Sequence, residues 1–419
     1  WAGSLQFGTT EEDLASTGGL LMTDDGGMVL GGSSEADIDG MGFGGERDAW
    51  VRKLTRRGDV AWTYVARDAD AGFARNVLPN PSGDGYYVVI NKAADTSSSI
   101  VESDVVRIDS NGIELWRAAI DFETTADIVR GAYWSVVGEG GDIYTLTWLA
   151  GPRGFLLTRV DGSNGATVWN REYFGSATVP ELFPDSSVLV ARGLAVEADG
   201  HAIVSGFFLS GSSRECSVCG FVLKLDPEGL VVWSQEITPM SLGACGRMSE
   251  HFMGRVTTAS DGSLLVAGTS ERAVATGQLG VLLSFSTDGS TLNWSYCDQA
   301  ADDDGVDRSR FLTDILETAD GGFLMYGSLD FGDNPTTGLP IEDLVLIKID
   351  ADGNEVFRRV SREERADGTP AEQQAGSIAV DAQGAIFATG AIDGELAPGV
   401  SIGGLDVFLR RFDAEGSPR

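Results

Sequence analysis

A repeat of roughly 60 residues runs through the chain and constrains its fold more than any other feature. One aromatic residue recurs at nearly even spacing, and the series is Trp1, Trp62, Trp116, Trp169, Trp233, Trp294 and Phe357. Seven such periods account for all 419 residues. A repeat of this length is one supersecondary unit that must pack against its neighbours. We therefore expect one repeat domain over 1–419 rather than two or three unrelated domains.

Each repeat contains four short apolar runs that are separated by turns. The first turn is of the Asp-Gly type, as in Asp199-Gly200, and the last run carries the aromatic residue, as in Gly229-Leu-Val-Val-Trp233. The runs are rich in Val, Ile and Leu, and none shows a sustained helical period, which indicates strands. Four strands in each of seven repeats predict an all-β, seven-bladed propeller of four-stranded blades.

The two ends of the chain complement each other. The last repeat stops after its third run and the turn Asp413-Ala-Glu-Gly416, while residues 1–7 look like the tryptophan strand Trp169–Gly175. We expect residues 1–7 to supply the outer strand of blade 7 and close the ring, which removes open strand edges. The expected blades span about 14–66, 73–120, 128–174, 188–237, 252–297, 310–361 and 374–416 plus 1–7.

Two short motifs carry a resemblance to known proteins. The Asp320-Gly321-Gly322 turn and the Leu-Asp-x-x-Gly-x-x-x-Trp tail, seen at Leu225–Trp233, resemble the repeats of secreted bacterial β-propeller proteins. The tail is also similar to the tryptophan-docking repeat of quinoprotein dehydrogenases. The first resemblance implies an exported propeller whose signal peptide is removed before Trp1. Quinoprotein chemistry is not expected, because that family has eight blades and an adjacent cysteine pair that this sequence lacks.

The charge of the chain limits its partners. There are 63 acidic and 30 basic residues, for a formal net charge of −33. Phosphate backbones and anionic membrane surfaces attract clustered Lys and Arg, so neither nucleic acid nor a lipid surface is expected as a partner. No apolar run is long enough for a transmembrane helix. We expect a protein partner or a surface assembly instead.

The loops and a set of arginines indicate where binding is expected. Connections that precede the third strand of a blade, or that join two blades, are long and irregular, as at 34–47, 95–103, 178–187, 238–252, 299–310, 330–342 and 362–374. Such loops on a rigid scaffold usually hold the binding site, although neutral lengthening gives the same pattern. Near the start of the inner strands of blades 2 to 5 stand Arg75, Arg130, Arg192 and Arg255.

These four arginines are predicted to form a partial cationic ring at the channel mouth. Arginine holds carboxylate or phosphate through two parallel hydrogen bonds, which suits a small anionic ligand. The alternative is that each arginine pairs with a loop carboxylate, and the candidates are Asp68, Glu123, Asp185 and Glu250.

Cysteines and acidic loops offer two further kinds of site. Cys216, Cys219, Cys245 and Cys297 favour disulfides in an exported protein, with the connectivity open. A zinc site is the weaker interpretation, because only one Cys-x-x-Cys pair is present. Asp302, Asp304 and Asp307 are calcium candidates, as is the segment Asp37-Ile-Asp39-Gly40, yet neither completes an EF-hand loop. A solvated acidic loop is the alternative, and no other cofactor is expected.

Catalytic patterns are sparse. The two histidines, His201 and His251, are expected on opposite faces, and no nucleophile-elbow, zinc-protease or P-loop motif occurs. The tryptophan series is interpreted as packing between blades, and Trp134 and Trp148 fall outside it. The sequence thus favours an exported, non-catalytic binding or scaffold propeller that uses its long-loop face. An enzyme of the lyase or glycoside hydrolase type at the channel mouth is one alternative, and a structural subunit of an extracellular or cell-envelope complex is another.

Overall fold

The structure is a computed structural model of the chain. The residues it describes are 3–42, 46–67, 71–93, 102–122, 129–149, 154–174, 188–209, 216–238, 248–272, 278–298, 309–333, 340–365, 368–394, 396 and 404–419. The predicted calcium ligands Asp302, Asp304 and Asp307 lie outside these residues, as does Cys245.

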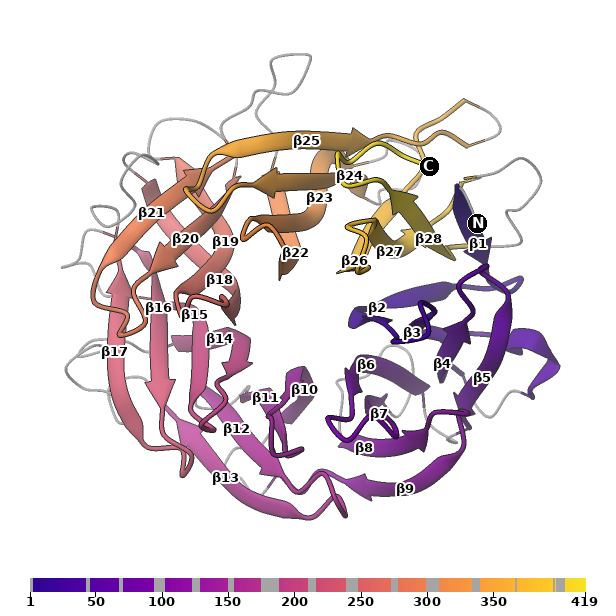
Figure 1. The fold of residues 1–419 in the computed structure, drawn as a ribbon, viewed down its shortest axis with the longest axis horizontal. Helices are drawn as coiled ribbons and strands as arrows, with labels where there is room; N and C mark the ends of the chain where they lie inside the picture. Colours follow the sequence, from indigo (N-terminus) through magenta and orange to yellow (C-terminus); the bar gives the residue numbers. More distant parts are fainter. Residues whose placement is uncertain are drawn as a thin grey trace. The chain divides into compact units, whose positions relative to one another are not determined.

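Four-stranded antiparallel blades make the fold an all-β, seven-bladed propeller, as the repeat predicts (Figure 1). Blade 1 contains β2 (Asp13–Met22), β3 (Met28–Ser34), β4 (Asp48–Leu54) and β5 (Val60–Ala66). Blade 2 contains β6 (Ala71–Pro79), β7 (Gly85–Ala93), β8 (Glu102–Asp109) and β9 (Glu114–Ala119). Blade 3 contains β10 (Val129–Val137), β11 (Ile143–Leu149), β12 (Gly154–Val160) and β13 (Thr167–Tyr173).

The remaining blades follow the same order. Blade 4 contains β14 (Val188–Val196), β15 (Ala202–Leu209), β16 (Val218–Leu225) and β17 (Val231–Ile237). Blade 5 contains β18 (Met248–Thr258), β19 (Leu264–Arg272), β20 (Gln278–Phe285) and β21 (Leu292–Cys297). Blade 6 contains β22 (Ser309–Glu317), β23 (Phe323–Asp333), β24 (Pro340–Ile349) and β25 (Glu355–Ser361). Blade 7 contains β26 (Gln373–Val380), β27 (Ile386–Ile392), β28 (Asp406–Phe412) and β1 (Ser4–Phe7).

By its internal contacts the chain divides into two compact units. The first comprises Trp1–Ile120, Met325–Ile347 and Phe357–Arg419, and the second comprises Asp121–Leu324 and Lys348–Val356. Blades 1, 2 and 7 belong to the first unit, and blades 3, 4 and 5 belong to the second. In the described part of the chain, helix is limited to a short 3-10 turn at Ile38–Gly40. None of the described helical structure is long and apolar enough to cross a membrane.

The N-terminal strand completes the last blade, as predicted. β1 pairs antiparallel with β28, with Ser4 opposite Arg410 and Phe7 opposite Val407 (Figure 1). The sheet order β1-β28-β27-β26 places it at the outer position that the other blades fill with their tryptophan strand. The first and last segments of the chain therefore share one sheet, which covers the edge that β28 would otherwise expose.

Short turns of one kind join the first and second strands of every blade. In blade 4 the Glu197 amide donates to the His201 carbonyl at 2.8 Å, and the Gly200 amide donates to the Glu197 carbonyl at 2.9 Å. Gly200 has φ +86°, a conformation that costs a residue with a Cβ atom. The closing hydrogen bond spans five residues in six blades, as at Thr23–Gly27 in blade 1 and Asp381–Ala385 in blade 7, and six residues in blade 2, at Asn80–Gly85. The recurring Asp-Gly motif thus reflects one turn geometry.

The aromatic series packs one blade against the next, which confirms the interpretation of the tryptophan series as packing between blades. Five of these rings lie against a glycine in the turn between the third and fourth strands of the following blade, namely Trp62, Trp169, Trp233, Trp294 and Phe357. A Cβ atom on Gly112 would lie 2.6 Å from the Trp62 ring, and one on Gly229 would lie 3.2 Å from the Trp169 ring. The indole Nε1 of Trp62 also donates to the Ser110 carbonyl at 3.0 Å. The tail motif therefore pairs a large ring with the one residue type that leaves room for it.

Blades 4 and 5 are linked more closely than the other described pairs. A single parallel bridge joins Val218 of β16 to Glu250 of β18, so their strands form one extended sheet. Cys216, just before β16, forms a disulfide with Cys219 in β16, which confirms the preference for disulfides over a zinc site at this pair. Cys297 is also disulfide-bonded.

Candidate functional site

Arg192 occupies an irregular position in the inner strand of blade 4. The pairing of β14 with β15 shifts register between Ala191 and Gly193, so Arg192 sits in a β-bulge. Bulges redirect a side chain out of the regular alternation of the strand. The backbone around the Arg192 bulge is packed too closely for side chains at two glycines. A Cβ atom on Gly193 would lie 2.8 Å from the Val256 amide nitrogen, and one on Gly206 would lie 2.8 Å from the Ala191 Cα.

The structure corrects the expected position of two arginines along their strands. Arg75 and Arg192 were expected near the start of their strands, but each is the fifth residue of its strand, in β6 and β14. In both strands the pairing begins four residues before the arginine. β6 already pairs at Ala71 with Ala93, and β14 already pairs at Val188 with Leu209. Both arginines lie at register shifts, so they are equivalent to each other.

Aromatic rings surround the Arg192 guanidinium. Its central carbon lies 4.9 Å from the centroid of Trp148, 5.6 Å from that of Phe207 and 5.8 Å from that of Tyr133. These distances fall within the usual range of cation–π attraction. We call Arg192, Tyr133, Trp148 and Phe207 the Arg192 cluster; all four residues belong to the second unit.

Further contacts hold the rings of the cluster in place. Tyr133 and Trp148 are stacked, with centroids 4.7 Å apart and an interplanar angle of 14°. The Trp148 Nε1 donates to the Ala191 carbonyl at 2.6 Å, directly before the bulge residue. Phe207 meets Phe252 of β18 edge-on, at 5.1 Å. The site is therefore preorganised, because the same ring that flanks the cation also anchors the backbone that carries it.

The hydrogen bonds of Arg192 are few. The side chain is half-buried, and its Nη1 donates to the Tyr133 hydroxyl at a long 3.5 Å. Its Nε is fully buried and has no hydrogen-bond partner in the described part of the protein. Among the described residues no carboxylate pairs with Arg192, and the predicted partner Asp185 lies outside them. A guanidinium has five N–H donors, so most of the binding capacity of this one is unused by the described residues.

Two residues of the Arg192 cluster differ in type from the residues at the equivalent position of the other blades. Trp148 and Phe207 are each the sixth residue of the second strand of their blade. At the equivalent place the other blades carry small or polar residues, namely Ser33, Asn91, Thr269, Ser328 and Ala391. Asn91 is the seventh residue of β7, because the first turn of blade 2, which closes between Asn80 and Gly85, is one residue longer than in the other blades. Packing of the blades therefore does not require an aromatic ring here. The sequence marked Trp148 as outside the tryptophan series, while Tyr133 and Phe207 were missed and become visible only when the strands are aligned by their turns.

The other predicted arginines have different surroundings. Arg255 is 7% exposed, donates from Nε to the Thr313 carbonyl at 2.6 Å and lies 3.3 Å from the centroid of the Trp134 ring. Arg75 is half-buried in the first unit, and the side chain of Arg130 lies outside the described residues. A ligand role for these three stays a prediction.

Neither histidine belongs to the contacts described for Arg192. His251 is fully buried, and burial lowers its pKa to about 4. Its Nδ1 lies 2.8 Å from the Ser270 hydroxyl, and its Nε2 is buried with no partner among the described residues. His201 lies beside Asp199, with Nδ1 2.9 Å from the carboxylate. His251 is thus a neutral core residue and His201 is a turn residue.

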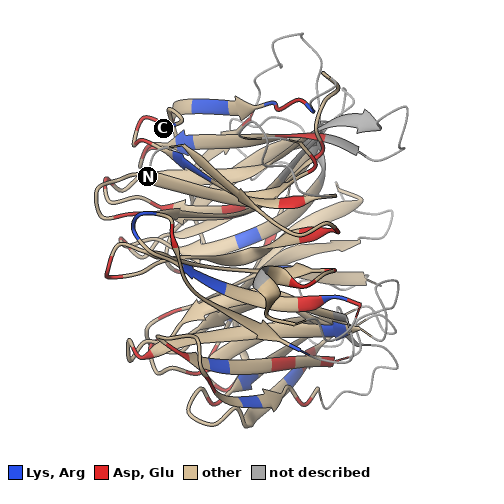
Figure 2. Cartoon of the chain, turned by 90° about the vertical axis from the view of Figure 1, so that its right-hand side faces the viewer, with Lys and Arg blue, Asp and Glu red and all other residues tan. Residues whose placement is uncertain are grey.

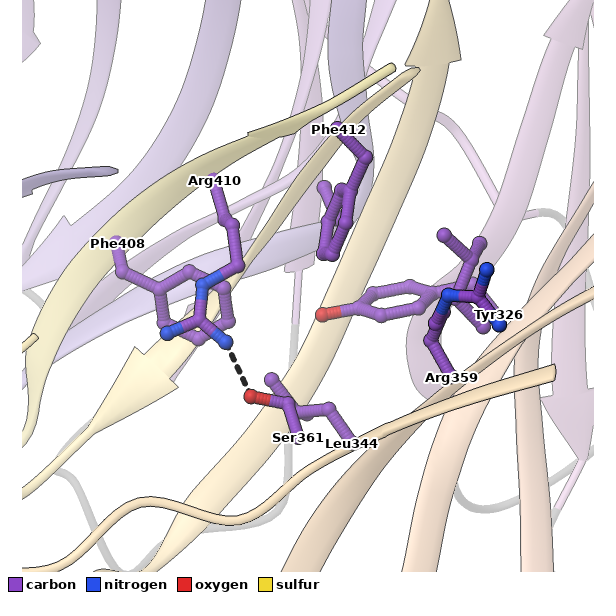
Figure 3. Close-up of a pocket in the computed structure, with 9 residues that line it drawn as sticks. Tyr326, Leu344, Arg359, Ser361, Phe408, Arg410 and Phe412 are labelled. Atoms are coloured by element: carbon purple, nitrogen blue, oxygen red, sulfur yellow. Dashed lines mark hydrogen bonds between the residues drawn. The ribbon is translucent and has the colours of Figure 1, made fainter. Parts of the chain in front are cut away.

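A second candidate is the cleft between blades 6 and 7 in the first unit (Figure 3). It encloses about 20 Å³ behind Arg359, Ser361 and Arg410, and it opens into a groove of about 820 Å³ beside the chain ends. The donors of its cations are occupied. Arg359 donates to the Gly416 carbonyl at 3.1 Å and to the Glu415 carbonyl at 2.9 Å, and Arg410 pairs with Glu363 at 2.5 Å and bonds Ser361. The cleft is therefore a weaker candidate than the Arg192 cluster.

Most cations near the short turns are also neutralised. Figure 2 shows Asp and Glu at many turns and strand ends, and Lys and Arg mainly within strands. Near the end of the third strand, a cation pairs with the acidic residue of the first turn in several blades: Lys53 with Asp25, Arg107 with Asp84, Arg159 with Asp142, Lys224 with Glu197 and Lys348 with Asp320, at 2.5–2.8 Å. Arg192 stands apart from this pattern.

Comparison with known proteins supports the fold. No protein-family model matches the sequence, and no curated protein matches it. Similar solved structures include the polysaccharide lyase Uly1, which is 8% identical with a TM-score of 0.50 and coverage of 94% of this chain and 89% of that chain. The β-propeller domain of the Trilobed protease from Pyrococcus furiosus is 10% identical with a TM-score of 0.48 over 93% and 97% of the two chains. The Dos1 propeller is 9% identical with a TM-score of 0.45 over 98% and 85%. At these identities the likeness concerns the fold alone.

Proposed function

We propose that this chain is an exported, non-catalytic binding propeller that holds an anionic ligand at the Arg192 cluster. One observation carries the proposal: a half-buried guanidinium, ringed by three aromatic side chains, has a single hydrogen bond of 3.5 Å among the described residues. Leaving donors unsatisfied in such a setting costs free energy. An anion that accepts from the open donors would offset this cost and complete the site.

The location of the cluster fits a binding role. Trp148 and Phe207 stand near the ends of β11 and β15, next to connections that lead to the third strand of each blade. Binding sites are found preferentially on such connections when a rigid scaffold presents them. Most of the residues in these two connections lie outside the described ones.

Export is proposed on the cysteine chemistry. The Cys216–Cys219 disulfide is the kind of bond that persists in oxidising compartments and is rare in the cytosol. Together with the repeat motifs, it supports an extracellular, cell-surface or periplasmic location. A fractionation experiment on the source cells, with an antibody against the chain, tests this part; recovery in the cytosol would contradict it.

The binding proposal is tested by ligand-observed NMR with a set of small anions: acetate, benzoate, methyl glucuronide and inorganic phosphate. We expect at least one anion to bind, and we expect Arg192→Ala to weaken that binding tenfold or more. The control is Arg171→Ala, because Arg171 is an exposed arginine whose Nε donates to the Glu228 carbonyl at 3.1 Å. Absence of binding by every anion, or equal binding by the two variants, would refute the proposal.

The same samples separate binding from catalysis. Tyr133 places a hydroxyl beside the Arg192 cation, and such a pair is also compatible with proton transfer in a lyase. A binding protein returns its ligand unchanged after long incubation. Oligosaccharides of glucuronate are therefore incubated with the protein and followed by the ultraviolet absorbance of the double bond that elimination creates. A rise that Arg192→Ala abolishes would replace the binding role with the enzymatic alternative.

A further inference from the structure

We propose that the ligand of the Arg192 cluster is a sugar ring that carries a carboxylate, that is, a uronate unit of a saccharide. This inference rests on the proposed function and names the chemical class of its ligand. It depends on three features of the cluster: the number of cations, the kind of surface around them and the exposure of the rings.

The number of cations favours a carboxylate over a phosphate. Arg192 is the cluster's only cation, and Arg255 is buried against Trp134 and bonded to the Thr313 carbonyl. A single guanidinium matches the charge and the planar fork of one carboxylate. A phosphate monoester carries nearly twice that charge near neutral pH. The chain also has a net charge of −33, which disfavours a dianion more than a monoanion.

The surface around the cation favours a ring over a bare carboxylate. Tyr133, Trp148 and Phe207 place three aromatic rings within 4.9–5.8 Å of the guanidinium carbon, from strands β10, β11 and β15. Acetate covers little of such a surface. A pyranose ring has a face of C–H bonds that removes aromatic area from water, while its carboxylate reaches the cation. Ligand sites commonly combine aromatic walls with a few placed polar groups in this way.

The exposure of the cluster favours a sugar over an aromatic acid. Tyr133 and Trp148 are half-buried, and Trp148 and Phe207 stand near strand ends. A ligand held there keeps one side in water. Hydroxyl groups on that side remain hydrated, whereas a wholly apolar ring would gain more from full enclosure. The open side also leaves room for neighbouring sugar units of an oligosaccharide.

The test compares four matched probes by tryptophan fluorescence titration, with NMR as a second readout. Methyl glucuronide and methyl glucoside differ only in the carboxylate; glucose 6-phosphate replaces it with a dianion; benzoate keeps the carboxylate on an aromatic ring. We expect the glucuronide to bind at least tenfold more tightly than each of the other three. In Arg192→Ala the glucuronide and the glucoside should bind equally weakly, because only the carboxylate contact is lost.

A second variant separates the ring surface from the charge. Phe207→Thr installs the residue type that blade 5 has at the same place, Thr269. We expect it to weaken both sugars by a similar factor and to keep the preference for the glucuronide. Because Phe207 is 8% exposed, its removal also affects packing, so Phe207→Leu serves as a second, milder variant. Circular dichroism and thermal melting confirm that each variant is folded.

Each outcome decides between the two proposals. Tighter binding of benzoate or glucose 6-phosphate than of glucuronide would overturn the sugar carboxylate and leave anion binding at Arg192 intact. Glucuronide binding that is unchanged in Arg192→Ala would overturn the inference, because the ligand would then lie elsewhere. If no probe binds, and the wider anion set of the previous section fails as well, both proposals fall.

Discussion

A glycine pair in blade 2 offers a quantitative test of how the aromatic series stabilises the propeller. Gly112 and Gly83 both sit in turns with positive φ, at +79° and +76°. A Cβ atom on Gly112 would lie 2.6 Å from the Trp62 ring, whereas a Cβ atom on Gly83 would meet nothing within 4 Å. Both positions therefore require a residue that tolerates positive φ, but only Gly112 is also in contact with an aromatic ring.

The expected costs follow from these contacts. Alanine at positive φ costs roughly 1–2 kcal/mol, offset by about 0.4–1 kcal/mol because the unfolded chain also loses freedom. Gly83→Ala should thus destabilise by about 1 kcal/mol. Gly112→Ala must also displace an indole that is held by the Ser110 carbonyl at 3.0 Å, and overpacking of this kind costs roughly 1–3 kcal/mol more. We expect a difference of about 2 kcal/mol between the variants.

Urea unfolding followed by tryptophan fluorescence measures this difference. A double-mutant cycle with Trp62→Ala provides the control, because removal of the ring should reduce the cost of Gly112→Ala to that of Gly83→Ala. If both glycine variants lose the same stability within about 0.5 kcal/mol, or if the cycle shows no coupling, the docked ring is not what requires glycine at this turn.

Three further predictions concern the chain ends, pH and the turn ion pairs. Deletion of residues 1–8 removes the β1–β28 pairing and should lower the melting temperature by many degrees in calorimetry; an unchanged melt would contradict closure by this strand. The His251 imidazole has a pKa near 6.5 in the unfolded chain and about 4 in the folded protein, so the free energy of unfolding should fall as the pH decreases through this window. We expect a fall of about 2 kcal/mol between pH 7 and 5 in urea titrations, and His251→Asn should remove most of it. Replacement of Lys348 by Met should raise the pKa of Asp320 from about 2 toward 3.8 in a carboxyl NMR titration, because the Lys348 hydrogen bond is the main cause of the low value.

The propeller could be predicted from sequence because the residues that its turns and its ring contacts require recur at fixed places in the repeat. The turn between the first two strands has a positive-φ glycine in every blade, and an Asp precedes that glycine in four blades, as at Asp199-Gly200. The aromatic residue needs a glycine in the next blade, so the tail recurs as it does at Gly229 and Trp233. The turn requirement acts within a few residues, whereas the ring and its glycine are one repeat apart, and both recur at fixed places in the repeat.

The site could be predicted only in part, because its determinants are not local. Arg192 stood out as a scarce cation at a repeated place, but the bulge that redirects it adds no visible mark to the apolar pattern. Tyr133 and Phe207 look like ordinary strand residues until the strands are aligned by their turns. The register of strand pairing, and not the residue composition, determines which side chains meet at this site.

Comparison among the blades of one chain distinguishes what the fold requires from what it tolerates. The pairs Lys53–Asp25, Lys224–Glu197 and Lys348–Asp320 recur because one turn geometry recurs, so cations at these positions need no ligand to explain them. The aromatic rings at Trp148 and Phe207 cannot be explained in this way, because the same position is small or polar in the other five blades. A half-buried cation with one long hydrogen bond among the described residues stands between those two rings. Since neither feature is needed for a stable blade, their coincidence at one place is better explained by a ligand than by packing.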